Sequence, residues 1–576
     1  MKKVLYISLL SNILLILSVT LTAQKAELFF KAAGSPSDPK VQASWNKYYT
    51  YGGITELCKK LVAAYPGLIT MESAGKSYQG RDIIALTITD RKSGDPDHKP
   101  GFYIDGNIHS NEIQGTEMAL YTAWYLCEMY NENKFINELL KDKVFYILPT
   151  INPDARQYFM DKPNSANSPR SGLVPVDNDR DGLYDEDGYD DLNNDDIISL
   201  MRRKSEYGTY NADPKDPRRM VRAEPGMKGE YEILGYEGID NDGDGLINED
   251  PVGGYDGNRD YGFNWEPSYV QQGAGKYPFS FPENQAVRDF SLRHRNITGA
   301  QSFHNSGGLV LRGPSIRGGG AETFSRTDET VLNTIGKKGQ EIIPGYKFIT
   351  IWKDMYTVYG GELDWWYGAI GSYVYSNELW NDYLMFNDTA NTDEYEFDRL
   401  LLFEDAFVPW QVVDHPVYGK IEVGGFNKNF GRIHPGFLLE SDSHRNAAFC
   451  IYNAWVTPKL EVTGVKVKDI GGGLKEVTAT VVNRQLMPTH SGTNLKYMID
   501  PPDYISLEGG NAIAGMVMTD KDRNIGIEQK KDPQRLEVQN IEGYQHIDVK
   551  WIVRGGDRFS VKVESVKGGT ASANQE

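Results

Sequence analysis

The feature that most constrains the fold of this chain is an alternation of strand-like and helix-like apolar patterns between residues 54 and 148. Apolar residues recur at helical spacing over residues 54–65 and again over residues 113–130. Continuous apolar runs typical of buried strands lie at residues 83–88, 101–104 and 144–148. Buried strands that alternate with helices predict an α/β domain with a mostly parallel or mixed central sheet flanked by helices.

The 576 residues exceed one ordinary domain, and the texture of the sequence changes twice. Residues 164–257 are rich in Asp, Asn, Gly and Pro and lack periodicity, which indicates an acidic insertion within a first domain of residues 24–457. After residue 458, period-two runs at 462–467, 476–482, 546–553 and 559–563 predict a β-sandwich over residues 458–566. The tail, residues 567–576, is predicted to be disordered.

The N-terminus has the form of a secretory signal. Lys2 and Lys3 precede an apolar stretch from Val4 to about Leu21, and Thr22-Ala23 is a small-residue cleavage site, so residues 1–23 are predicted to be a signal peptide. An uncleaved anchor helix is the alternative. We therefore expect a secreted or periplasmic protein that leaves the membrane after cleavage.

The net charge argues against one class of partner, and the cysteines argue against one kind of metal site. The net charge of -19 argues against nucleic acid as a partner. The three cysteines, Cys58, Cys127 and Cys450, lie in apolar contexts and include no CxxC pair, so we expect buried thiols and no cysteine-based zinc site.

Four short patches, far apart in the sequence, together have the residue types of one zinc site. A catalytic zinc ion needs about three nitrogen or carboxylate ligands and an open position. His109, Glu112 and His304 provide a His2Glu set, and Glu378 provides a carboxylate to act on water. Arg259 provides a fixed cation for an anionic group of a substrate.

The order of these patches resembles the zinc carboxypeptidase family of the pancreatic type. The chain has His-x-x-Glu at 109–112, Asn-Arg at 258–259, Ser-Phe-His at 302–304, and the block Tyr356…Gly360-Gly361…Asp364-Trp365 leading to Glu378. The similarity covers about residues 45–160 and 255–385. It implies a secreted metallocarboxypeptidase that hydrolyses the C-terminal peptide bond of peptides with a free carboxylate.

The resemblance implies a role for each matching residue. His109, Glu112 and His304 would bind one catalytic Zn2+, and Glu378 would be the general base. Asn258, Arg259 and Tyr356 would bind the terminal carboxylate of the substrate, and Leu363 would line the specificity pocket. Arg202, beside Arg203, is predicted to stabilise the oxyanion.

The acidic insertion contains two D-x-D-x-D-G runs that begin at Asp177 and Asp240, and a poorer run at residues 191–195. Alternating carboxylates before a glycine turn suit Ca2+, which prefers six to eight oxygen ligands, and a solvated acidic loop is the alternative. No EF-hand glutamate or flanking helices are evident. The candidate ligands for a structural Ca2+ are Asp177, Asp179, Asp181, Asp185, Asp187, Asp240, Asp242, Asp244, Asn248 and Asp250.

Several alternatives remain open at the level of sequence. The same chemistry could act on cell-wall or side-chain-linked peptides, or the chain could be an inactive binding protein whose β-domain contacts a surface or partner. Glu440 is a rival catalytic carboxylate, and Asn264 marks a rival register for the Asn-Arg pair.

Overall fold

The computed structural model describes residues 30–178, 180–317 and 324–576. The predicted signal peptide, residues 1–23, and Asp179 lie outside the described residues. The chain divides into two units, residues 1–40 and 41–576, and every element described below belongs to the second unit. None of the described helices has the length and apolar character needed to cross a bilayer.

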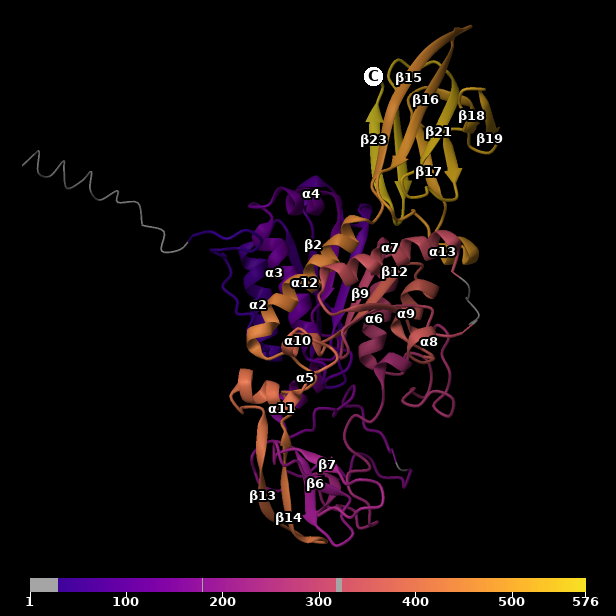
Figure 1. Ribbon diagram of the computed structural model, residues 1–576. Coiled ribbons are helices and arrows are strands. Elements are labelled where there is room, and N and C mark those ends of the chain that lie inside the picture. Colours follow the sequence, from indigo (N-terminus) through magenta and orange to yellow (C-terminus); the bar gives the residue numbers. More distant parts are fainter. Residues whose placement is uncertain (1–29, 179, 318–323) are drawn as a thin grey trace, which may run out of the picture. The chain divides into compact units, whose positions relative to one another are not determined.

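An eight-stranded mixed sheet forms the centre of the first domain and confirms the predicted α/β class (Figure 1). The pairs β3–β4, β3–β9, β9–β12 and β10–β11 are parallel, and the remaining neighbours are antiparallel. In sheet order the strands are β1 Ile69–Lys76, β2 Asp82–Ile88, β4 Val144–Leu148, β3 Gly101–Gly106, β9 Ile297–Asn305, β12 Tyr373–Leu379, β10 Leu309–Arg312 and β11 Lys347–Thr350.

Both faces of this sheet are buried, which explains why its central strands are almost continuously apolar. Along β3, Phe102 and Ile104 belong to one hydrophobic cluster, whereas Tyr103 belongs to another. The first cluster includes residues of α2 Tyr51–Ala64, α3 Gln114–Met129, α4 Lys134–Asp142, α7 Arg326–Ile342 and α12 Gly436–Trp455. The second cluster includes residues of α6 Pro282–Arg293 and of α9 Glu362–Asp364.

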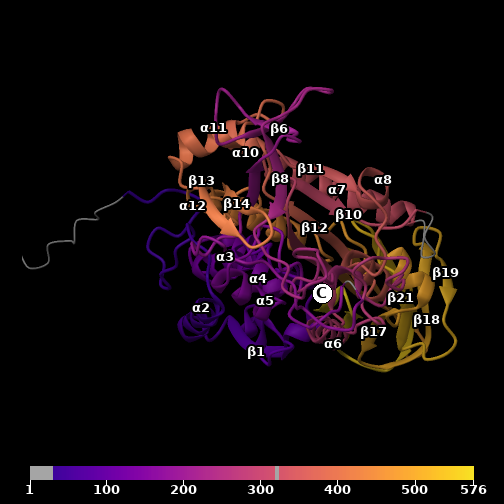
Figure 2. The same ribbon diagram turned by 90° about the horizontal axis from the view of Figure 1, so that it is seen from below.

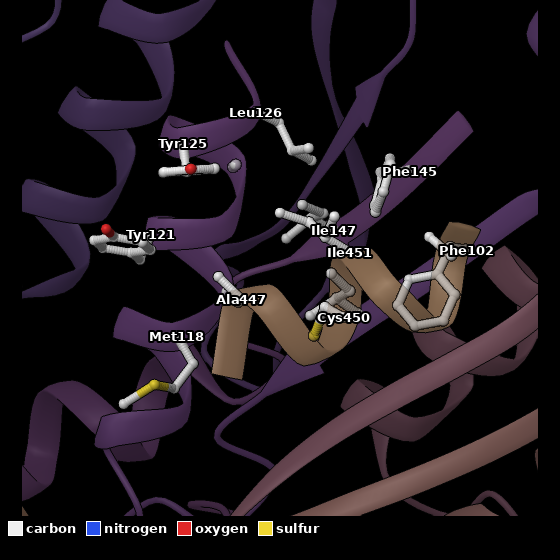
Figure 3. Close-up of a cluster of buried hydrophobic side chains, with 14 of the residues drawn as sticks. Phe102, Met118, Tyr121, Tyr125, Leu126, Phe145, Ile147, Ala447, Cys450 and Ile451 are labelled. Atoms are coloured by element: carbon white, nitrogen blue, oxygen red, sulfur yellow. The ribbon is translucent and has the colours of Figure 1, made fainter. Parts of the chain in front are cut away.

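Figure 3 shows where α3 and α12 meet the sheet: Met118, Tyr121 and Leu126 lie near Ala447 and Ile451. Burial of each large apolar side chain contributes about 1.5–3 kcal/mol, so this contact fixes α3 firmly on the sheet. Cys450 lies in the same cluster, and all three cysteines are buried free thiols, as predicted.

The acidic insertion contributes four strands to a second sheet. Its strands β5 Leu200–Lys204, β6 Tyr210–Ala212, β7 Met220–Arg222 and β8 Tyr231–Tyr236 join β13 Phe407–His415 and β14 Gly419–Phe426 in one six-stranded sheet. Figure 1 and Figure 2 show these strands in one part of the structure, and in the sheet β14 pairs with β5, while β8 lies between β5 and β6. Smaller helices are α5 Pro153–Asp161, α8 Ile351–Asp354, α10 Tyr383–Phe386, α11 Glu394–Phe397 and α13 Gly492–Tyr497.

The C-terminal region consists of two antiparallel sheets that share one hydrophobic cluster. The first is β15 Leu460–Gly471, β16 Leu474–Asn483, β21 His546–Arg554, β18 Asn511–Asp520 and β19 Ile525–Glu528. The second is β20 Arg535–Val538, β17 Asp503–Glu508, β22 Ser560–Ser565 and β23 Gly569–Asn574.

The predicted disorder of residues 567–576 is wrong, because β23 pairs with β22 over six residues, from Ser560–Asn574 to Ser565–Gly569. Ala571 and Ala573 also pack against the hydrophobic cluster of this region. Small side chains give this segment little apolar surface, so the ladder of backbone hydrogen bonds supplies the order that composition does not indicate.

Candidate metal centre

His109 and Glu112 lie in the tight connection between β3 and α3. Asn107 has a left-handed backbone (φ 65°), and its side-chain amide donates hydrogen bonds to the carbonyl oxygens of His109 (2.7 Å) and Ser110 (3.2 Å). Gly115, at the start of α3, lies so close to β9 that an added Cβ would be 2.9 Å from the Cβ of Phe303. The strand end and the helix start therefore hold this imidazole and this carboxylate rigidly.

His304 reaches the same place from the neighbouring strand. It lies near the end of β9, which runs parallel to β3, and the ends of parallel strands meet at one edge of a sheet. His109, Glu112 and His304 are all buried, and they offer ligand atoms that lie within 4.8 Å of one another. The structure thus brings together the three ligands that the sequence indicates.

The geometry of these three donors fits a tetrahedral Zn2+. The Nδ1 atoms of His109 and His304 are 3.1 Å apart, and Glu112 Oε2 lies 3.0 Å from the first and 3.1 Å from the second. A tetrahedral ion about 2.0–2.1 Å from each ligand holds neighbouring donors about 3.3 Å apart. Two imidazoles and one carboxylate at this spacing are the donor set of a catalytic zinc site with one open position.

Two carboxylates on the outer side of the histidines fix which ring nitrogens face the metal position. Asp256 Oδ1 lies 2.8 Å from His109 Nε2, and Glu362 Oε1 lies 2.7 Å from His304 Nε2. A carboxylate at Nε2 favours a proton there and leaves Nδ1 free to act as a ligand. Neither Asp256 nor Glu362 is predicted from the sequence, because neither lies in a local pattern that indicates contact with a histidine.

Glu362 is fully buried, and its second oxygen, Oε2, has no hydrogen-bond partner within the described part of the chain. Its backbone N–H donates to Asn258 Oδ1 at 2.8 Å. Although burial opposes a charge on His304, Glu362 and Glu112 raise the pKa of this imidazole well above its usual range in the metal-free site. A cation at the metal position would take the place of that proton.

Glu112 is also held by cations. Arg170 Nη1 donates to Glu112 Oε1 at 2.8 Å, and Arg432 Nη2 donates to the same oxygen at 3.3 Å. Burial alone would raise the pKa of Glu112, but His109 and Arg170 keep it well below its usual range. Glu112 is therefore a carboxylate over the whole neutral range, as a metal ligand must be.

Arg202 is not at this site, which corrects the prediction that it stabilises the oxyanion. It lies on β5 opposite Glu422 of β14, and its Nε donates to Glu422 Oε2 at 2.7 Å. Its guanidinium carbon lies 3.9 Å from the ring centre of Trp410 and 4.4 Å from that of Tyr231. The charge of Arg202 is thus paired within the insertion sheet, whereas Arg170 and Arg432 contact the candidate metal ligand Glu112.

One pocket opens beside the metal position. Its lining includes the predicted substrate-binding residues as well as Arg170 and both histidines. The wall residues are His109, Arg170, Asn258, Arg259, His304, Leu311, Ser315, Ile351, Met355, Tyr356, Val358, Gly361, Leu363, Ser376 and Glu378.

The polar side of this pocket carries Arg259, which is 8% exposed. Arg259 Nη1 donates to the carbonyl oxygen of Asn258 at 2.7 Å, and Nη2 lies 3.7 Å from Asp256 Oδ2. Tyr356 is 53% exposed at the same pocket, so its side chain is accessible to a bound substrate. A buried guanidinium that faces a pocket suits a bound carboxylate.

Glu378 lies on β12, in direct register with His304 on β9, and lines the pocket. Burial and the negative charge of Glu112 raise the pKa of Glu378 to about 7 in the metal-free site. A carboxylate tuned to this range can accept a proton from water and release it again near neutral pH.

Glu440 and Asn264, the rival candidates for the catalytic carboxylate and for the Asn-Arg pair, do not line this pocket. Glu440 is an exposed residue of α12, outside the lining of this pocket. Asn264 donates through Nδ2 to Asp364 Oδ2 at 3.1 Å and is not among the residues that line the pocket. Asn258 and Arg259 are the Asn-Arg pair that lines it.

The candidate Ca2+ ligands divide into two sets. Asp181, Asp187, Asp240, Asp242 and Asp244 lie in three overlapping acidic groups, which also contain Glu186 and Glu249. Neither Glu186 nor Glu249 is among the candidates predicted from the sequence, although they directly precede two of those candidates, Asp187 and Asp250.

The other described candidates lie outside these groups and have local partners. Asp177 accepts a hydrogen bond from Arg180 N, and Asp185 accepts one from Val176 N. Asn248 donates to the carbonyl oxygens of Tyr236 and Glu237. Asp250 accepts hydrogen bonds from Asn178 and from Asp185 N.

Comparison with known proteins gives two family matches. A model described as zinc carboxypeptidase matches residues 54–396, and a model described as a domain of unknown function matches residues 459–576. The chain is 31% identical over 137 residues to "Inactive metallocarboxypeptidase ECM14" of Ajellomyces capsulatus, which is 24% of this chain and 23% of that protein. It is 29% identical over 116 residues to carboxypeptidase D of Rattus norvegicus, which is 20% of this chain and 8% of that protein.

The matched region thus spans less than a quarter of the length of these curated relatives. Among solved structures, the carboxypeptidase A from Helicoverpa armigera aligns with a TM-score of 0.42 and 18% identity over 74% of this chain and 76% of that chain.

Proposed function

This chain belongs to the zinc carboxypeptidase family, and from this premise we propose that it is an active zinc metallocarboxypeptidase, which removes the C-terminal residue of peptides. The observation that carries the proposal is the convergence of His109, Glu112 and His304 beside Glu378 and Arg259. These residues come from separate parts of the sequence, and each has the chemistry that one step of peptide hydrolysis requires.

When bound by the two histidines and Glu112, Zn2+ would act as a Lewis acid that polarises the scissile carbonyl and lowers the pKa of a nearby water. Glu378 accepts the proton of the attacking water on its carboxylate. It then donates this proton to the nitrogen of the leaving amine, so that the residue ends in its starting state. Its position on β12 keeps the carboxylate beside the metal ligands throughout.

Arg170 stabilises the negative charge that develops on the carbonyl oxygen of the substrate. It is the guanidinium that lines the pocket next to Glu112, and its side chain is 35% exposed, so it keeps N–H groups available for a substrate. Although burial disfavours its charge, Glu112 and Asp256 hold the pKa of Arg170 above its usual range. Preorganised donors of this kind often make the largest contribution to catalysis.

Arg259, Asn258 and Tyr356 bind the terminal carboxylate of the substrate. Arg259 is a planar donor suited to a carboxylate, and the exposed phenol of Tyr356 closes over the bound end. A cation at the end of the pocket restricts cleavage to the last peptide bond, because an internal peptide segment offers no charge to it.

The remaining wall of the pocket favours an apolar C-terminal side chain. Leu363 lies there with Leu311, Ile351, Met355 and Val358, and Glu378 is the pocket's acidic lining residue within the described part of the chain. A basic side chain would find no further carboxylate in this pocket to pair with. We therefore propose leucine-like or aromatic C-terminal residues as preferred substrates.

Two further observations bear on the proposal. The match to an inactive metallocarboxypeptidase raises an inactive protein as the alternative, and the presence of Glu378 together with all three ligands supports the active form. The signal-like pattern of residues 1–23 supports export, so we propose that the substrates are peptides outside the cytoplasm, including those of the cell wall.

The test is hydrolysis of matched peptides by the zinc-loaded full chain, followed by mass spectrometry. We expect release of one C-terminal Phe or Leu from a peptide with a free carboxylate and none from the same peptide with a C-terminal amide. A chelator should abolish release, and added Zn2+ should restore it. Equal cleavage of the amide, or no cleavage of any free peptide or muropeptide by a protein that holds one equivalent of Zn2+, would contradict the proposal.

A further inference from the structure

The two acidic runs of the insertion close on each other in the structure. They have the same pattern, D-N-D-R-D-G-L-Y-D-E-D from Asp177 and D-N-D-G-D-G-L-I-N-E-D from Asp240. The last aspartate of each run, Asp187 and Asp250, pairs with the other as an antiparallel bridge, in which Asp250 N donates to the carbonyl oxygen of Asp187 at 3.2 Å.

The asparagine at the second position of each run binds the last aspartate of the other run. Asn178 Nδ2 donates to Asp250 Oδ1 at 2.6 Å, and Asn241 Nδ2 donates to Asp187 Oδ1 at 3.1 Å. This reciprocal pairing makes the two runs one unit and brings their acidic side chains together. Asp242 belongs to each of the three acidic groups, and one of these groups is Asp187, Asp242 and Glu249.

Two carboxylate oxygens of this unit are buried without a hydrogen-bond donor among the described residues. Asp187 is fully buried, and its Oδ2 has no hydrogen-bond partner within the described residues; the same holds for Glu249 Oε2, which is also buried. Across the described ranges, the ion pairs include none from Lys or Arg to Asp187, Asp242 or Glu249. Buried carboxylate oxygens without a partner are costly, so these two oxygens favour a bound cation.

The pKa of Glu249 reflects this crowding. Burial and the neighbouring Asp187 raise it to about 7, which means that the charged form is disfavoured where it stands. A bound cation would remove the repulsion and supply the missing partner for Asp187 Oδ2 and Glu249 Oε2.

We propose that Asp187, Asp242 and Glu249 form the core of a Ca2+ site that joins the two acidic runs. All its donors are carboxylate oxygens, whereas zinc prefers sites with nitrogen or sulfur donors. Asp240 and Asp244 lie in a group with Asp242, and their side chains are aligned by the loop backbone, since Asp240 accepts from Gly245 N at 3.0 Å and Asp244 from Leu246 N at 2.7 Å. A flexible set of five or more carboxylates suits Ca2+ better than Mg2+, which requires a near-ideal octahedron.

The ion would act on the metal centre through the ends of the insertion. Arg170, which binds Glu112, lies seven residues before Asp177, and Asp256, which binds His109, lies six residues after Asp250. Closing the two runs on one cation fixes both flanks of the insertion. We therefore expect Ca2+ to tighten zinc binding as well, and this second effect rests on the proposed zinc site, whereas Ca2+ binding itself does not.

The experiment uses the full chain, freed of divalent ions on a chelating resin and reloaded with one equivalent of Zn2+. Titration calorimetry with CaCl2 should give a dissociation constant between about 10⁻⁶ and 10⁻³ M, and MgCl2 should bind at least tenfold more weakly. Ca2+ should also slow tryptic cleavage after Arg180, an exposed residue within the first run. No binding at 10⁻² M Ca2+, or equal binding of Mg2+, would overturn the proposal.

The matched variants are Asp242→Asn and Asp191→Asn. Asp242 is exposed, so the folded chain should tolerate the change, yet we expect it to weaken Ca2+ binding at least tenfold and to remove the protection of Arg180. Asp191 lies in the same insertion and accepts backbone hydrogen bonds, from Asp195 N and Asp196 N, but belongs to none of the three groups. Its variant should behave as the parent chain, and equal Ca2+ affinity for all three proteins would refute the assignment.

The link to the zinc centre has its own readout. Release of Zn2+ to a coloured chelator should be slower with Ca2+ present in the parent chain, and Ca2+ should make no difference in Asp242→Asn. If Ca2+ binds but leaves Zn2+ release unchanged, the coupling is wrong and the Ca2+ site stands. Peptide hydrolysis is measured separately, so a failure of the proposed activity leaves the calorimetric result intact.

Discussion

Glu378 of β12 and His304 of β9 are register partners on neighbouring parallel strands, so one ladder of backbone hydrogen bonds fixes the proposed base relative to a metal ligand. β9 also pairs with β3, whose end carries His109. The centre of the sheet thus fixes His304, His109 and Glu378 relative to one another, while Tyr356 is an exposed residue at the same pocket.

Replacement of Glu378 by Gln should abolish turnover and leave the metal in place. The amide cannot accept the proton of water, so we expect kcat to fall by about 10³–10⁴-fold, while the zinc content stays at one per chain. Glu440→Gln is the control, since this exposed residue of α12 lies outside the pocket lining and its variant should retain full activity. The reverse pattern would make Glu440 the catalytic carboxylate.

Arg170 and Arg202 should separate catalysis from stability. Arg170→Met removes the donor beside Glu112, and we expect kcat to fall by about 10²–10³-fold. Arg202→Met removes an ion pair with Glu422 and two contacts with aromatic rings, and should lower the free energy of unfolding by about 1–2 kcal/mol. If the Arg202 variant lost kcat while its melting temperature stayed unchanged, Arg202 would have a catalytic role and not a structural one.

The sequence predicts the parts of this molecule whose signals are local. Strand and helix periods predict the central sheet and α3, because both faces of the sheet must bury apolar side chains. His109 and Glu112 share one turn, and His304 follows an apolar strand, so each residue has a recognisable setting. The period-two runs after residue 458 predict four of the C-terminal strands in the same way.

The parts that escaped prediction depend on contacts between distant residues. Arg170 is 58 residues from Glu112, and Arg432 is 320 residues from it, so nothing around either arginine indicates its target. The insertion strands pair with β13 and β14, and Arg202 meets Glu422 across 220 residues. The family resemblance therefore predicts a catalytic role for Arg202 from its position in the sequence, whereas the strand that binds its charge, β14, is far away in the sequence.

Glu362 should control how tightly zinc is held. Glu362→Gln keeps a hydrogen-bond acceptor for His304 Nε2 but removes the negative charge that increases the basicity of the ring, so we expect the dissociation constant for Zn2+ to rise by about 10–100-fold. Competition with a chelator of known affinity measures it. Glu283→Gln removes another buried carboxylate, one bound to Tyr78 N, and should leave zinc affinity unchanged. Equal affinities in the parent and both variants would remove Glu362 from the metal centre.

The raised pKa of Glu378 predicts a pH-dependent stability of the metal-free protein. Its carboxyl has an ordinary pKa of 4.5 and a folded-state pKa of about 7, so the folded state binds the proton more tightly than the unfolded state. The free energy of unfolding must then fall as pH rises from about 4.5 to about 7, and the loss is complete above that range. Glu378→Gln cannot lose this proton, so at pH 8 we expect the metal-free variant to be more stable than the parent by roughly 1–3 kcal/mol, with no difference at pH 4. Urea unfolding at both pH values measures it. Zn2+ should remove the difference at pH 8, because a dication beside Glu378 favours its charged form. A metal-free variant that is less stable than the parent at pH 8 would show that burial does not raise the pKa of Glu378.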